Sequence, residues 1–169
     1  MLPLVRWLIV VCLGCVSPVL SGCGSCRDVS RDPEYLGSMS IGSSYELRAD
    51  VFLYDVNIDR LPFDHYACTP SLWLYPPGDD SYGTPLPTTE EYRQKHKPRA
   101  IRGIVAAGTR LSLTKLLFHD FVTGAQLYYV FTIRSGDHTG KKVAGDALMT
   151  RDTRHSPGVP NDIFLQPMR

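Results

Sequence analysis

Apolar and polar residues alternate along two stretches of the chain, and each stretch predicts a strand with one buried face. From Tyr45 to Tyr54 the odd positions are apolar and the even positions are polar or aromatic. The second stretch, from Gln126 to Arg134, is the strongest strand in the sequence. One of its faces carries Leu127, Tyr129, Phe131 and Ile133, and the other carries Tyr128, Val130 and Thr132.

Further runs bounded by turn residues predict more strands, and the one at 109–118 also alternates, with Leu111 and Leu113 on one face. They cover residues 71–75, 101–106, 109–118, 141–144 and, as a closing edge strand, 162–165. Glycine-containing turns are predicted at 107–108, 122–125 and 135–140. Thr88 and Glu91 have the spacing of a capping box, and basic residues follow until Pro98. This pattern predicts one short surface helix.

Five to seven short strands with tight turns predict a mainly β fold, a small antiparallel barrel or sandwich. The segment from Arg102 to Leu111, with Ala107-Gly108-Thr109 as its turn, resembles bacterial Src-homology-3-like barrels. That resemblance covers about a third of the chain and implies a small barrel. The sequence differs from the family in its long Pro-rich insertion and in lacking a Trp near the last turn.

The first residues of the chain have the layout of an export signal. Arg6 precedes an apolar run that extends from Trp7 to Val16, and small residues follow. The alternative, a transmembrane helix, needs about 20 apolar residues, whereas Ser17 and Pro18 interrupt this run. The sequence therefore predicts a signal peptide over residues 1–22.

The residues Leu20-Ser21-Gly22-Cys23 resemble the lipobox of bacterial lipoproteins. The resemblance implies a diacylglyceryl group on the sulfur of Cys23, fatty acyl chains such as palmitate, and cleavage just before that cysteine. Two acyl chains give a stable anchor where one gives only marginal binding. Gly24, in place of an Asp, implies the outer membrane facing the periplasm. The alternative is an ordinary secretory signal with a chance cysteine.

Removing residues 1–22 leaves a length that suits one domain. Residues 23–44 are rich in Gly, Ser, Asp and Arg and show no periodicity, which predicts a lipidated, flexible tether. Residues 45–169 are predicted to form a single β-rich domain with a Pro-rich insertion at about 55–100.

The remaining cysteines outside the signal and the lipobox are Cys26 and Cys68. An even pair in an oxidising compartment suggests a disulfide between them. The alternative is two free thiols, because sequence alone cannot place the two Cα atoms within reach of each other.

The charge of the mature chain argues against two classes of partner. Arg6 is one of 18 Lys and Arg residues, so the mature part carries as many basic residues as its 17 acidic ones. A nucleic-acid binder needs a basic surplus to meet phosphate. Attachment to a membrane through a polybasic patch needs the same surplus.

Two short clusters could carry catalysis, and neither has a defined geometry. Asp64, His65 and Cys68 could meet in a turn as a thiol nucleophile with its base, and His119-Asp120 is the second cluster. The five histidines have no zinc-type spacing, so no metal site and no cofactor are expected. The segment 136–142 lacks the order of a phosphate loop and is predicted to be a turn.

The sequence therefore predicts a non-enzymatic envelope lipoprotein whose β-rich domain binds an envelope partner or has a structural role. Two alternatives stay open: an envelope hydrolase or thiol enzyme using His65 and Cys68, and a peptidoglycan-binding module. Four aromatic residues could form a contact surface or could simply fill the core. They are Tyr54, Trp73, Tyr75 and Tyr82.

Overall fold

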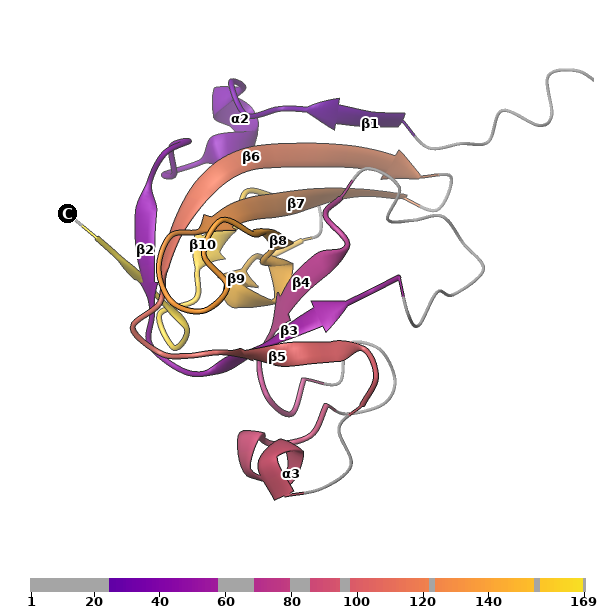
Figure 1. Ribbon diagram of the computed structural model, residues 1–169. Coiled ribbons are helices and arrows are strands. Elements are labelled where there is room, and N and C mark those ends of the chain that lie inside the picture. The colour runs from indigo at the N-terminus through magenta and orange to yellow at the C-terminus, as the bar shows by residue number, and fades with distance from the viewer. Residues whose placement is uncertain are drawn as a thin grey trace, which may run out of the picture.

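The computed structural model describes residues 25–57, 69–79, 86–94, 98–121, 124–153 and 156–168. Most of the regular structure is strand (Figure 1). The helical elements are α2 (Pro33–Leu36), α3 (Thr89–Gln94) and the 3-10 turn η1 (Asp146–Leu148). The strands are β1 (Ser25–Asp28), β2 (Ser44–Leu47), β3 (Val51–Asp55), β4 (Leu72–Tyr75), β5 (Ile101–Val105), β6 (Arg110–Phe121), β7 (Gly124–Ile133), β8 (Lys142–Ala144), β9 (Met149–Thr150), β10 (Val159–Pro160) and β11 (Leu165–Pro167).

One curled sheet contains all the strands except the β9–β10 pair. Its order is β11-β2-β6-β7-β8-β4-β3-β5, and β1 pairs with the second half of β6. The mainly β prediction is confirmed. The sheet is not wholly antiparallel, however, because β4 and β8 pair in parallel at Trp73 and Ala144. It is also not a closed barrel, since its end strands β11 and β5 do not pair with each other in the part of the chain that is described.

The stretch from Tyr45 to Tyr54 forms two strands, where the alternation predicted one. The chain bends at residues 48–50, so that β2 pairs with β6 while β3 pairs with β4 and β5. Leu47 and Gly108 hold the bend, because the Gly108 N–H donates to the Leu47 carbonyl at 2.7 Å. The φ of +82° at Gly108 is one that glycine adopts readily. The Asp50 carboxylate accepts from the Ala107 N–H at 3.0 Å and completes this corner.

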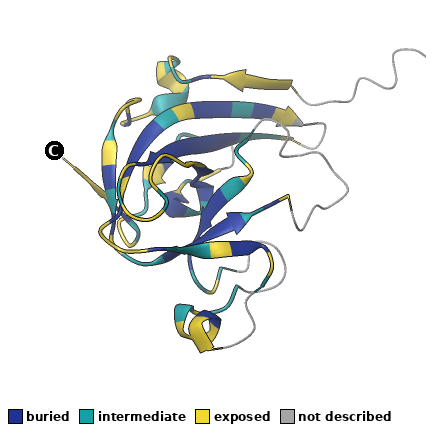
Figure 2. Cartoon of the chain, viewed as in Figure 1, coloured by how far each residue is buried: buried dark blue, intermediate teal, exposed yellow. Residues whose placement is uncertain are grey.

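The predicted face of β7 lies in the main core. Leu127, Phe131 and Ile133 are fully buried inside the curl of the sheet together with Tyr129. This inner cluster also includes residues from η1, from the segment before β2 and from most of the other strands, among them β2, β3, β6 and β8. In Figure 2 the strands β6 and β7 are mostly buried, as a strand flanked on both faces should be.

A second cluster lies on the opposite face of β3, β4 and β7, and it is mainly aromatic. Trp73 stacks on Tyr75 with ring centres 5.9 Å apart, and Tyr128 meets Trp73 edge-on at 5.7 Å. Tyr54 packs edge-on against Tyr75. The three residues considered above as a contact surface, Tyr54, Trp73 and Tyr75, are thus core residues with at most 8 % of their surface exposed. Tyr82 lies outside the described residues.

The prediction of a flexible tether before Tyr45 is wrong for the described residues from Ser25 onward. β1 pairs with β6, and Val29 and Met39 are buried in the inner cluster. Asp32 caps α2 by accepting from the Glu34 N–H at 3.1 Å, and Pro33 occupies its first turn. Tyr35 and Leu36 also pack against this cluster, and these few apolar residues are not spaced in a periodic pattern in the sequence.

The surface helix is confirmed at α3. The Glu91 N–H donates to the Thr88 hydroxyl at 3.2 Å, and the Glu91 carboxylate accepts from the Thr88 N–H at 2.9 Å. This is the reciprocal pair of a capping box. The predicted edge strand at 162–165 begins later, because residues 162–164 form a turn and β11 starts at Leu165.

Candidate functional site

The predicted anchor lies next to the first described strand. Cys23 is outside the described residues, and β1 begins at Ser25. Within β1, Cys26 stands opposite His119 of β6 in the register. Cys26 is disulfide-bonded. Cys68 lies outside the described residues, so the pairing of Cys26 with Cys68 stays a prediction.

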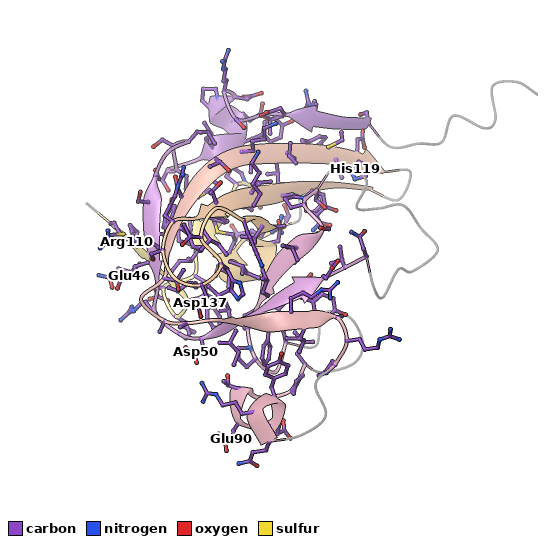
Figure 3. All side chains as sticks on the ribbon, viewed as in Figure 1. Glu46, Asp50, Glu90, Arg110, His119 and Asp137 are labelled. Carbon is purple, nitrogen blue, oxygen red and sulfur yellow. The ribbon has the colours of Figure 1, made fainter. Side chains whose placement is uncertain are left out.

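The two candidate catalytic clusters do not form one site in the described part of the chain. Asp64, His65 and Cys68 lie outside it. His119 is buried near the end of β6, where its ring lies 6.4 Å from the Tyr128 ring (Figure 3). Asp120 is exposed and pairs with Ser25 across the strands. His119 is therefore part of the packing between β1, β6 and β7.

The turn at 136–142 uses its own backbone groups for internal hydrogen bonds. The Thr139 N–H donates to the Gly136 carbonyl at 3.2 Å, and the Lys141 N–H donates to the His138 carbonyl at 3.2 Å. The Gly140 N–H donates to the Ile133 carbonyl at 2.8 Å. A phosphate loop would present such N–H groups to a ligand, so the predicted turn accounts for this segment. No group of three metal-ligating side chains occurs among the described residues.

The strongest polar cluster lies where β7, η1 and the segment after β9 meet. Arg151 Nη2 donates to Asp146 Oδ1 at 3.2 Å, and Nη1 donates to the Leu127 carbonyl at 2.9 Å. The Arg151 guanidinium lies 5.8 Å from the centre of the Tyr129 ring. The Tyr129 hydroxyl accepts from the Gly158 N–H at 2.5 Å. Asp146 and Arg151, five residues apart, thus form one largely buried network with Tyr129 of β7.

The Asp146 carboxyl is enclosed, and this sets its protonation. Burial raises the pKa of Asp146 to about 7, although the Arg151 charge and nearby backbone N–H groups favour ionisation. Its second oxygen, Oδ2, is buried and has no hydrogen-bond partner among the described residues. A carboxyl with one satisfied oxygen gains less from ionisation than a fully solvated one. Asp146 therefore exchanges a proton near neutral pH.

Close packing surrounds the network. A side chain at Gly145 would meet the Phe131 ring at 2.7 Å, and one at Gly158 would meet the Tyr129 hydroxyl at 3.0 Å. These glycines let the backbone approach the sheet closely enough for Asp146 and Arg151 to interact. The arrangement holds Arg151 and Gly158 against β7. It brings a proton-exchanging group and a cation together in an enclosed place.

Sequence reasoning did not identify Asp146, Arg151 or Tyr129 as a cluster. One signal was present: Asp146 is the only charged residue in the stretch from Val143 to Thr150. A lone carboxylate in an apolar segment is rarely buried without a partner. The position of that partner depends on the turn after β9, which leaves no periodic signature.

Comparison with known protein families, with curated proteins and with solved structures finds no match to this chain. Within the described ranges, no helix is both long enough and apolar enough to cross a membrane.

Proposed function

We propose that this protein is a lipid-anchored envelope lipoprotein whose β-rich domain binds an envelope partner or supports the envelope structurally, without catalysis. The anchor is the lipid on Cys23, and the outer membrane facing the periplasm is its location. One observation carries the proposal. Strand β1 begins at Ser25, two residues after the cysteine of the predicted lipobox.

The attachment of β1 to the sheet supports a domain held close to its anchor. Arg27 of β1 donates to the Tyr35 hydroxyl at 2.8 Å, and its guanidinium lies 4.8 Å from the centre of the Phe118 ring. At roughly 3.3 Å per residue, Cys23 lies within about 7 Å of Ser25. Lipid on Cys23 would therefore keep the domain at the membrane surface.

The position of β1 also gives the domain an orientation at that surface. Ser25 pairs with Asp120, close to the hairpin between β6 and β7. Figure 1 shows β1 starting at the end of the sheet opposite the C-terminus. The hairpin end would face the membrane. The corner with Asp50 and the turn with Asp137, labelled in Figure 3, would face away and be available to a partner.

Intact-mass spectrometry of the protein made as the full chain in a Gram-negative host tests the proposal. We expect a mature chain that starts at Cys23 and carries acyl chains. The Cys23→Ser variant should remain uncleaved and unacylated. The Cys26→Ser variant is the matched control, because it removes a nearby cysteine and should still be lipidated. A mature N-terminus at another residue, or an unmodified Cys23, would contradict the proposal.

A further inference from the structure

One face of the sheet gathers basic side chains where β6 begins and β7 ends. Leu111 and Leu113 of β6 and Ile133 of β7 are buried in the inner cluster. Because side chains alternate along a strand, Arg110 and Arg134 lie on the opposite face. The Arg134 N–H donates to the Arg110 carbonyl at 2.7 Å, so the two arginines stand directly opposite each other on neighbouring strands.

The same face continues into β8. Lys142 stands opposite Thr132 of β7, and Val143 beside it is buried in the inner cluster. Lys142 is therefore a diagonal neighbour of Arg134 on the face away from that cluster. Ser112 and Thr132 pair across β6 and β7, and both are buried. We call the following residues the basic face: Arg110, Ser112, Thr132, Arg134 and Lys142.

The cations of the basic face are exposed, and they are not neutralised within the described ranges. None of the ion pairs there includes Arg110, Arg134 or Lys142. Glu46 of β2 stands opposite Arg110 on its other side, and Figure 3 labels both, but the two form no ion pair. Like charges directly opposite each other on paired strands destabilise a sheet. An arrangement that costs stability in this way is expected at a surface that binds a ligand of opposite charge.

We propose that the basic face binds an acidic peptide segment of a partner protein, whose neighbouring carboxylates are held by Arg110 and Arg134. This inference rests on the proposed function, because it names the chemistry of the envelope partner. A guanidinium presents its N–H donors in a planar fork that matches a carboxylate. The Cα atoms of directly opposite residues are roughly 5.5 Å apart, so two guanidinium groups can hold two carboxylates of one short segment. Lys142 adds a third positive charge beside them.

The size and the position of the basic face favour a peptide over a membrane or a nucleic acid. A cluster that binds anionic lipid has about four to eight basic residues, whereas this face is smaller and has Glu46 beside it. Arg110 is the first residue of β6, while β1, which follows the predicted anchor, pairs with the second half of that strand. The basic face therefore lies at the end of β6 far from the anchor, which points to a partner on the side away from the membrane.

Fluorescence anisotropy with fluorescein-labelled hexaglutamate tests the proposal on the full chain, purified from cells in a neutral detergent. We expect wild type to bind the peptide at low ionic strength and to bind it more weakly as salt screens the contacts. Arg134→Glu should lower the affinity by about tenfold or more, because it removes one cation and repels the peptide. Arg31→Glu is the matched control, since it makes the same charge change at an exposed residue before α2. Its affinity should stay within about twofold of wild type, because salt screens charges that are distant from the peptide.

Urea denaturation of the same variants separates binding from folding. Arg134→Glu places a carboxylate opposite Arg110, so its urea midpoint should stay unchanged or rise. The proposal is overturned if wild type does not bind hexaglutamate, if Arg134→Glu keeps the wild-type affinity, or if Arg31→Glu loses as much affinity. It is also overturned if the midpoint of Arg134→Glu falls below that of wild type, or if inorganic phosphate displaces the labelled peptide at a lower concentration than unlabelled hexaglutamate does.

Intact-mass spectrometry of the same preparation keeps this test separate from that of the anchor. Binding by a chain without acyl groups on Cys23 supports the basic face while the anchoring proposal fails. An acylated chain that does not bind the peptide overturns the basic face alone.

Discussion

The region around η1 and β9 and the sheet edge formed by β3 and β5 each hold an aspartate against an arginine. At the edge, Arg102 Nη2 lies 2.8 Å from Asp55 Oδ2, and Nε of the same side chain donates to that oxygen at 3.1 Å. In the buried region the distance from Arg151 to Asp146 is longer, 3.2 Å. The side chains of Arg102 and Arg151 are 49 % and 14 % exposed, respectively.

The two pairs differ in a way that indicates that burial, more than distance, decides how much stability is lost when one partner of an ion pair is removed. Water reaches the shorter Asp55–Arg102 pair from the side of Arg102, which is half exposed, although the Asp55 side chain is only 14 % exposed. The Asp146–Arg151 pair has lost that hydration, so neither partner tolerates the loss of the other. The buried pair is therefore a point of vulnerability, and the exposed pair is nearly replaceable.

Arg151→Ala should have the largest effect. It leaves Asp146 without its cation and the Leu127 carbonyl without a donor, so we expect a loss of about 3–5 kcal/mol in the free energy of unfolding. Urea denaturation at about pH 8, where Asp146 is ionised, measures it. Arg102→Ala under the same conditions is the control. Equal losses in the two variants would mean that burial does not separate the two regions.

The second-largest effect should appear in the pH dependence of wild-type stability, because Asp146 of the buried pair titrates. The folded pKa of Asp146 is raised to about 7 from 3.8, so the folded state holds a proton that the unfolded state releases. The contribution of this group is complete below the unfolded pKa and is lost as pH rises to the folded one. Stability from Asp146 should thus fall by about 1.4 kcal/mol per pH unit within this window. The contribution of Asp146 is the difference between the urea midpoints of wild type and Asp146→Asn, measured across this pH range. If the two midpoints change with pH in parallel, Asp146 does not cause the pH dependence.

Arg102→Ala should cost no more than about 1 kcal/mol. Asp55 keeps a second tie, because it accepts from the Asn57 N–H at 3.1 Å. Its carboxylate can therefore turn to solvent without being stranded. Chemical denaturation at low and high salt provides the measurement, and the small difference should shrink further in high salt. A loss above about 2 kcal/mol would mean that the Asp55–Arg102 pair behaves like the buried pair, contrary to this expectation.

The sequence predicted strands and turns around the two ion pairs, but it did not predict the ion pairs. Alternation identified the inward face of β7, and turn residues identified the hairpin and the α3 cap. Alternation could not reveal the bend between β2 and β3, because Phe52 and Tyr54 are as apolar as their neighbours and both faces of β3 are buried. A period-two pattern reports one buried face and is silent when both are covered.

The N-terminal segment was misread for a related reason. Val29 and Met39 are widely spaced buried residues in a polar stretch, and β1 is exposed along its whole length. Its pairing with β6 comes from backbone hydrogen bonds, which do not depend on side-chain type. The Asp146–Arg151 pair is likewise formed by tertiary contact alone, since residues five apart share no face of a strand.

Lys115→Ala should show the smallest effect and completes the series of ion pairs. Lys115 Nζ lies 3.3 Å from Asp28 Oδ2, with both side chains about half exposed. The pKa of Asp28 is lowered chiefly by hydrogen bonds from the Ser30 side chain and backbone, and Lys115 contributes less. We expect a change within about 0.5 kcal/mol near neutral pH.

Ser30→Ala is the matched variant for that test. The Ser30 hydroxyl also accepts from the Leu116 N–H at 2.9 Å, so its loss removes a tie between β6 and the segment after β1. Because the pKa of folded Asp28 is lowered, its contribution is present above the unfolded value of 3.8 and is lost as pH falls through the folded value. Acid unfolding should therefore move to higher pH in Ser30→Ala and stay almost unchanged in Lys115→Ala. The reverse order would show that the exposed cation, rather than the local hydrogen bonds, holds Asp28 ionised.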